Sequence, residues 1–189
     1  MSLRTIKRRR KECKTDYGLR FGLLKSSLPR IVIRRTNKYF IIHIVESHEA
    51  QDKTIFGATS KDLLSYGWDE KTAGSLKSIS AGYLTGFMVA KKVKKGDFII
   101  DLGMAINHKG GRMFSVIAGL IDGGLGIRAN TKVLPPKERL MGEHLKSDVK
   151  DMVVKVKAKL ESVSGSEKKT EVKSEKKKPV KKTKKGTKE

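Results

Sequence analysis

The sequence predicts an α/β fold in which a mixed sheet is covered by helices. Two apolar runs flank a polar turn between residues 30 and 45, and helical patterns follow at 75–95 and 113–121. A short apolar run, residues 97–102, lies between these helices. A strand reached through a helix joins its neighbour in parallel by a right-handed crossover. We therefore expect an N-terminal antiparallel meander plus one parallel strand.

The segment 30–45 predicts a β-hairpin. Its apolar runs, 31–33 and 39–45, are rich in β-branched and aromatic residues, which fit a pleated surface. A third strand at 54–59, reached through a polar loop at 47–53, completes the meander. The hairpin tip contains Arg34, Arg35, Asn37 and Lys38, and its three cations are expected to meet phosphate.

The charge of the chain points to a polyanionic partner. The 189 residues carry a formal net charge of +23, with a pI of about 10.1. Residues 1–20 hold eight Lys or Arg and residues 164–189 hold eleven Lys, yet the part between them is basic as well. This distribution argues against a neutral enzyme with basic tails.

Composition divides the chain into four parts. We expect a basic RNA-binding arm at 1–20, an α/β core domain at 21–134, a linker with an amphipathic helix at 135–163, and a disordered Lys-rich tail at 164–189. The arm lacks an apolar period over residues 1–14, so it is expected to be extended and to order against phosphates. A solvated charge run or a localisation signal is the alternative.

Three features leave alternatives open. The amphipathic helix could pack back on the domain, meet a partner or lie on RNA. Gly82 and Gly86, inside the first long helix, predict close approach to a sheet. The pair Gly110-Gly111, flanked by Lys109 and Arg112, forms either a phosphate cradle at a helix N-terminus or a plain turn.

Nothing in the sequence indicates an active site. The four histidines are scattered, the single cysteine excludes a disulfide framework, and no metal, cofactor or small-molecule substrate is expected. Asp97 and Asp101 share a face of a predicted strand, where solvation of the strand end is favoured over a metal-binding pair. No apolar run is long enough to span a bilayer, and no secretory signal is expected, so we predict a cytoplasmic protein.

Several short motifs carry a family resemblance between residues 15 and 145. They are Thr15-Asp16-Tyr17, residues 29–34 with 36–38, residues 60–63 with 66–68, residues 83–86, residues 100–103 and residues 119–125. In order and spacing they resemble the large-subunit ribosomal protein family that carries 5S rRNA, known as L-eighteen, in its archaeal–eukaryotic branch. The resemblance implies α/β/α layers and a structural protein that binds 5S rRNA. It also implies that the protein helps to anchor 5S rRNA to 23S rRNA in the central protuberance, beside the L-five ribosomal protein.

The predicted rRNA-binding residues lie mainly in the arm and the hairpin. The resemblance carries over Arg8, Arg9, Arg10, Lys14, Tyr17, Arg30, Arg34, Arg35 and Lys38. Charge and position add Arg4, Lys7, Lys11, Arg20, Asn37, Lys109 and Arg112. Tyr17 is expected to stack on a base or ribose.

The Lys-rich tail departs from the family pattern and supports a second hypothesis. Its run at residues 176–185 is typical of a protein that compacts duplex DNA. Deletion of residues 164–189 separates the two hypotheses, since DNA compaction predicts loss of most binding and the rRNA-binding function predicts a modest loss.

Overall fold

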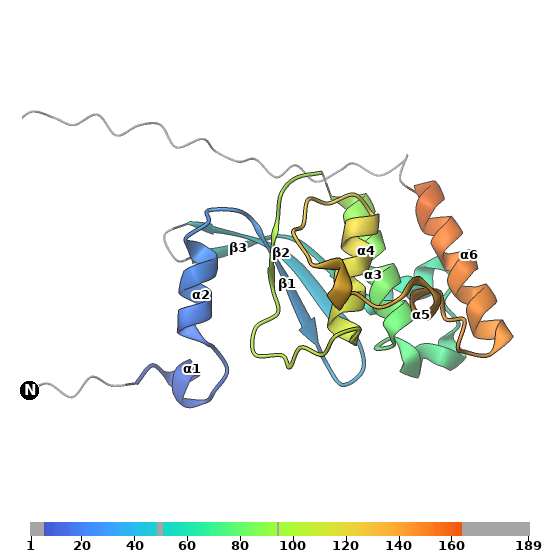
Figure 1. The fold of residues 1–189 in the computed structure, drawn as a ribbon, viewed down its shortest axis with the longest axis horizontal. Coiled ribbons are helices and arrows are strands. Elements are labelled where there is room, and N and C mark those ends of the chain that lie inside the picture. The colour runs from blue at the N-terminus through green and yellow to red at the C-terminus, as the bar shows by residue number, and fades with distance from the viewer. Residues whose placement is uncertain (1–5, 49–50, 94, 164–189) are drawn as a thin grey trace, which may run out of the picture.

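The computed structural model describes residues 6–48, 51–93 and 95–163, and its centre is one mixed sheet (Figure 1). The strands are β1 (Arg30–Arg35), β2 (Phe40–His48), β3 (Gln51–Thr59) and β4 (Ile99–Asp101), in the order β3-β2-β1-β4. β1 and β3 both pair antiparallel with β2, whereas β4 runs parallel to β1. The predicted meander and parallel strand are confirmed.

The helices precede, interrupt and follow these strands. The α-helices are α1 (Arg8–Lys11), α2 (Tyr17–Leu24), α3 (Ile79–Lys92), α4 (Arg112–Asp122), α5 (Lys137–Met141) and α6 (Ser147–Val163). Short 3-10 helices are η1 (Ser60–Tyr66), η2 (Glu70–Ser75) and η3 (Thr131–Val133). The predicted contact Arg4 and the predicted tail at 164–189 lie outside the described residues.

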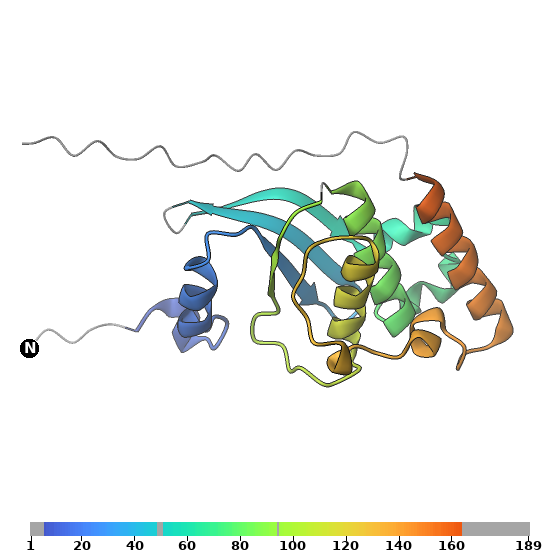
Figure 2. The same cartoon turned by 45° about the horizontal axis from the view of Figure 1, so that its top comes forward.

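Alternation along the strands separates an apolar face from a polar one. Ile31, Ile33, Ile42 and Ile44 are fully buried, and they join one core with side chains of α3 and α4. Residues of β1 between these positions point to the opposite face, on whose side α2 stands. In Figures 1 and 2 the pair α1–α2 and the helix α6 lie at opposite ends of the molecule.

The amphipathic helix packs back on the domain. Val153, Val156 and Leu160 of α6 are buried in the same core as α3, and Lys157 lies 5.6 Å from the ring centroid of Tyr83 in α3. Of the three alternatives for this segment, the structure therefore shows intramolecular packing. Leu145, within the segment 135–163 in which the amphipathic helix was expected, precedes α6 and is exposed.

The polar loop predicted at 47–53 is wrong. β2 continues to His48 and β3 begins at Gln51, with Glu46 opposite Lys53 and Ser47 opposite Asp52. These strand ends extend beyond the apolar core, so neither face needs apolar side chains and the alternation that marks a half-buried strand is lost. Cross-strand polar and opposite-charge pairs stabilise this part of the hairpin instead.

The prediction that the arm is extended is wrong for residues 8–11. Arg8–Lys11 form one helical turn, α1, and Lys7 lies above the ring of Tyr17 at 4.6 Å from its centroid. Nε of Arg9 also donates a hydrogen bond to Oγ1 of Thr15 at 2.9 Å. Contacts with the residues that follow therefore fold the arm locally, although it has no apolar period.

Glycines allow α3 and α4 to pack closely together. The close approach predicted for Gly82 and Gly86 is therefore mainly to α4, not to the sheet. A Cβ atom on Gly86 would collide with the backbone carbonyl of Val116, and one on Gly119 with that of Tyr83. A Cβ on Gly82 would lie 2.5 Å from Oγ of Ser115 and 3.1 Å from the ring of Phe40. Of these three glycines, only Gly82 also faces a strand residue. Their main role is to allow close contact between the two helices.

We expect Gly86→Ala to lower the free energy of unfolding by about 1–3 kcal/mol, because two backbones must separate to admit the methyl group. This loss outweighs the gain of about 1 kcal/mol in helix propensity. Urea denaturation followed by circular dichroism measures the change.

Gly22→Ala in α2 is the matched control, since a Cβ at Gly22 meets nothing within 4 Å. It should leave the free energy of unfolding unchanged or raise it by up to about 1 kcal/mol. Equal losses in the two variants would contradict the assigned role of Gly86.

Candidate nucleic-acid interface

The cations of α1 form an exposed basic group in the arm. Arg8, Arg9, Arg10 and Lys11 are consecutive and all exposed, and no residue of α1 is buried. In a single helical turn, four consecutive side chains project in different directions around the axis. The turn can therefore contact phosphates on more than one side.

Between the arm and the sheet lies a cleft of about 510 Å³. It brings together predicted RNA-binding residues that are far apart in the sequence, namely Arg9, Lys14, Tyr17 and Arg20 from the arm and Arg34 from β1. Asp52 and Asp101 also line it. The cleft therefore contains both cations and the carboxylates that bind some of them.

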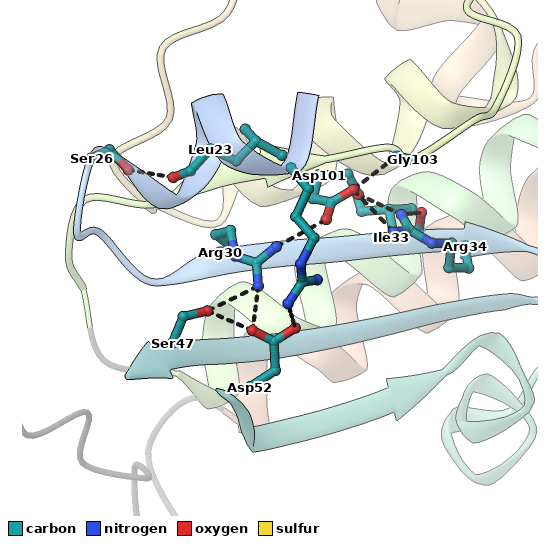
Figure 3. Close-up of polar contacts among 10 residues, drawn as sticks. Leu23, Ser26, Arg30, Ile33, Arg34, Ser47, Asp52, Asp101 and Gly103 are labelled. Atoms are coloured by element: carbon teal, nitrogen blue, oxygen red, sulfur yellow. Dashed lines mark hydrogen bonds and ion pairs between the residues drawn. The ribbon is translucent and has the colours of Figure 1, made fainter. Parts of the chain in front are cut away.

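Arg30, a predicted RNA contact, is buried in an ion-pair network (Figure 3). Its side chain is only 2% exposed, Nη1 donates to Oδ2 of Asp101 at 3.2 Å, and Nη2 donates to Oδ1 of Asp52 at 2.7 Å. Nη2 also donates to Oγ of Ser47 at 2.9 Å. A buried charge must be paired in this way. The burial makes Arg30 a structural cation and argues against its direct contact with phosphate.

Arg34 shares one of these carboxylates but keeps solvent access. Its Nη2 donates to Oδ1 of Asp101 at 3.0 Å, and Nη1 donates to the backbone carbonyl of Asp101 at 2.8 Å. The Arg34 side chain is nevertheless 44% exposed. Arg34 is bound to Asp101 and lines the cleft, so the cations that remain exposed at the hairpin tip are Arg35, the last residue of β1, and Lys38.

Arg20 of α2 reaches the same network from the arm. Its Nη2 donates to Oδ2 of Asp52 at 2.8 Å. Burial by itself would raise the pKa of Asp52, but hydrogen bonds from Ser47 and Arg20 and the charges of Arg30 and Arg20 outweigh it, so the pKa lies below its ordinary value.

The sequence does not indicate a role for Asp52, and for Asp101 it favours only strand-end solvation. Asp52 lies in the loop predicted at 47–53, where a carboxylate has no expected partner. One available signal was the pair Arg30 and Arg34, which share a face of β1 at a spacing of four and need acidic partners on neighbouring strands.

The glycine loop before α4 is a turn, not a phosphate cradle. The N–H of Gly110 donates to the carbonyl of Val133 at 2.9 Å, and that of Gly111 donates to the carbonyl of His108 at 2.9 Å. These two groups are therefore used within the protein. Lys109 and Arg112 beside them are exposed.

At the hairpin tip, Asn37 and Lys38 are exposed, and Thr36 orders the turn. Its Oγ1 donates to the carbonyl of Tyr39 at 2.8 Å and accepts the N–H of Tyr39 at 3.0 Å. The first turn of α4 and the start of β2 meet at Gly82 of α3. The tip and the glycine loop therefore lie near each other.

The described residues contain no cluster of three or more His, Cys, Asp or Glu side chains that could hold a metal ion. Asp97 precedes β4 and is exposed, whereas Asp101 is bound to two arginines. Among the helices in the described ranges, none is long and apolar enough to cross a membrane.

A small α/β scaffold with exposed arginines and lysines on an arm, a hairpin tip and a loop defines a basic protein of the nucleic-acid-binding class. The family described as ribosomal large subunit proteins 60S L5 and 50S L18 matches residues 2–97. The chain is 39% identical over 143 residues to the large ribosomal subunit protein uL18 of Korarchaeum cryptofilum, covering 74% of this chain and 71% of that protein.

It is also 40% identical over 141 residues to uL18 of Methanoregula boonei, covering 73% of this chain and 79% of the relative. For uL18 of Halobacterium salinarum the identity is 37% over 141 residues, covering 73% and 75%. The chain therefore belongs to the family of large-subunit ribosomal proteins that includes L5 and L18. The membership confirms the resemblance found in the motifs and, because the family is structural, the prediction that the protein is not an enzyme.

We expect Asp101→Asn to lower the free energy of unfolding by about 3 kcal/mol, because it removes a carboxylate shared by the buried Arg30 and by Arg34. This loss is at the low end of the range that is typical when one partner of a buried ion pair is removed, because Asp52 still binds Arg30. Asp97→Asn, which neutralises an exposed carboxylate four residues earlier, is the control and should change stability by less than about 0.5 kcal/mol. Urea denaturation of both variants gives the comparison, and equal stabilities would contradict the assigned role of Asp101.

The lowered pKa of Asp52 gives a pH prediction. As the pH falls, the unfolded chain protonates this carboxylate before the folded protein does. The contribution of Asp52 to the free energy of unfolding is therefore complete above the ordinary carboxyl pKa of about 4 and is lost as the pH falls below it. The wild-type protein should therefore lose more stability than Asp52→Asn between pH 5 and pH 2. Parallel stability curves from urea denaturation across this range would exclude the effect.

Proposed function

We propose that this chain is a structural constituent of the large ribosomal subunit that binds 5S rRNA and helps to anchor it to 23S rRNA in the central protuberance. In this proposal it acts in the cytoplasm and lies beside neighbouring large-subunit proteins, including one of the L-five family. The observation that carries the RNA-binding part is α1, where four consecutive cations are exposed on one helical turn. Membership in a family of large-subunit ribosomal proteins supports ribosomal RNA as the class of RNA.

The proposed contacts differ in the support that the structure gives them. The exposed or partly exposed cations of the arm and hairpin are the strongest candidates: Lys7, Arg8, Arg9, Arg10, Lys11, Lys14, Arg34, Arg35 and Lys38. Lys109 and Arg112 form a separate exposed pair before α4. Tyr17 is half-buried with Lys7 over its ring, so stacking on RNA uses the rest of its surface or requires Lys7 to move.

Two predicted contacts are better assigned to structure than to phosphate. Arg30 is 2% exposed and Arg20 is 31% exposed, and both are paired with Asp52, whereas Arg34, although paired with Asp101, is 44% exposed. We propose that they support the interface from behind. The alternative of DNA compaction depends on a segment outside the described residues and gains no support from the exposed arm and hairpin.

The first experiment is a gel-shift titration of the full chain against 5S rRNA, an unrelated structured RNA of equal length and a duplex DNA. At roughly 150 mM salt, non-specific binding typically weakens to a Kd of about 10⁻⁴–10⁻⁶ M. A preference for 5S rRNA of about a hundredfold or more is expected, which is a modest threshold beside the roughly thousandfold or larger preference of proteins for specific over non-specific DNA sites. Equal binding to all three would overturn the specific function.

The triple variant Arg8→Gln, Arg10→Gln, Lys11→Gln tests the arm within the same titration. The slope of log K against log salt is negative, and each lost phosphate contact should reduce its magnitude by about 0.7–0.9. The triple variant should therefore have a slope that is shallower by up to about 2–3. Lys146→Gln, Lys150→Gln, Lys155→Gln removes the same charge at the opposite end of the molecule and is the control. Equal slope losses would mean that the arm has no special part in binding.

A further inference from the structure

The helix that follows the arm's cations is only weakly held by apolar packing. No residue of α2 is buried, and Leu19 and Phe21 are 47% and 62% exposed. Leu23 and Leu24 are half-buried at its C-terminal end. On one side α2 borders the cleft of about 510 Å³ that separates it from the sheet. Apolar contact alone therefore does not determine its orientation.

A chain of polar contacts connects α2 to the sheet instead. Arg20 donates to one carboxylate oxygen of Asp52 at 2.8 Å, while Arg30 and Ser47 donate to the other at 2.7 and 2.6 Å. Arg30 is held in turn by Asp101 of β4 (Figure 3). Asp52 is thus fixed from the sheet side and presents its second oxygen to α2.

The contacts continue from α2 to the cations of α1. Asp16 caps α2 by accepting the N–H groups of Gly18 and Leu19 at 2.8 and 3.1 Å. Lys7 covers Tyr17 of α2, and Arg9 donates to Thr15. The position of α2 therefore determines where the exposed cations of α1 stand relative to the sheet.

We propose that Asp52 is a positioning residue for RNA binding, an acidic side chain that raises the affinity of this basic protein for RNA by holding the arm in place. The inference rests on the proposed function. Without Asp52 the arm must be ordered when RNA binds, and a pre-organised surface avoids that cost. Simple electrostatics predicts the opposite sign, because removal of a negative charge should strengthen attraction to phosphate.

The test compares binding of full-length variants to 5S rRNA by gel shift at fixed salt. Asp52→Asn should weaken binding by about tenfold or more although it raises the net charge by one. Asp52→Glu, which keeps the carboxylate, should recover most of the affinity. The control Asp151→Asn removes an exposed charge on α6 and should bind as tightly as wild type or slightly more tightly. Unchanged or tighter binding by Asp52→Asn would overturn the proposal.

A second measurement separates positioning from a general loss of folding. Asp52→Asn is placed in the background Arg8→Gln, Arg10→Gln, Lys11→Gln, in which the arm has lost three of its six proposed contacts. If Asp52 acts through the arm, the fold-change that the substitution causes should be clearly smaller there than in wild type, because coupled sites are non-additive. An equal loss in both backgrounds would assign Asp52 to overall stability and overturn the positioning role.

The two proposals fail in different ways. If wild type shows no preference for 5S rRNA over the unrelated RNA, the proposed function fails whatever Asp52 does. If wild type prefers 5S rRNA and Asp52→Asn matches it, only the positioning role is overturned. Circular dichroism of each variant at the binding temperature shows that folded protein is compared in every case.

Discussion

The guanidinium of Arg30 lies almost fully buried between two carboxylates, and the arrangement of the sheet depends on this pairing. Asp52 belongs to β3 and Asp101 to β4, which are the two outer strands in the order β3-β2-β1-β4. Arg30, on β1, thus connects both edges of the sheet. A slip of one residue in either pairing would turn a charged side chain toward the apolar face. The ion pairs therefore help to specify the register of the strands. Apolar side chains of similar shape would specify that register less well.

The two ends of the molecule are held by different kinds of force. At one end, α3, α4 and α6 share a close-packed apolar core in which glycines allow backbones to touch. At the other, α1 and α2 are held mainly by ion pairs, a cap and a cation–aromatic contact. Such contacts open at lower free energy than a core. The stable end serves as the scaffold, and the weaker end presents its cations in a form that RNA can further order.

Much of the fold could be predicted because its patterns are local. The β1–β2 hairpin followed from two runs rich in β-branched and aromatic residues, and the parallel β4 from strand–helix order. An apolar stripe predicted the amphipathic helix α6, although it left open what the stripe packs against. Partners distant in sequence could not be predicted in this way. A cation at residue 30 looks the same whether it meets phosphate or Asp101, and only the tertiary pairing distinguishes the two.

The same holds for the candidate site. Exposed cations in α1 and at the hairpin tip were recognisable from charge runs, but Asp52 was not, because a polar strand beyond the core has the composition of a loop. Gly82 and Gly86 indicated a close approach, yet the sequence could not say that the neighbour is mainly α4. Exposure of these cations follows from local composition, whereas a partner on a distant strand or helix cannot be read from composition.

The long β2–β3 pair also bears on how this protein avoids aggregation before it meets its partner. β3 is an edge strand that pairs with β2 alone among the described strands, and an open edge can recruit strands from other chains. Asp52 and Lys53 place charges on that edge, and the irregular register between Ile44 and Val45 distorts the ladder beside it. The polar strand ends that weaken the sequence signal for β3 thus also protect the free protein from edge-to-edge aggregation.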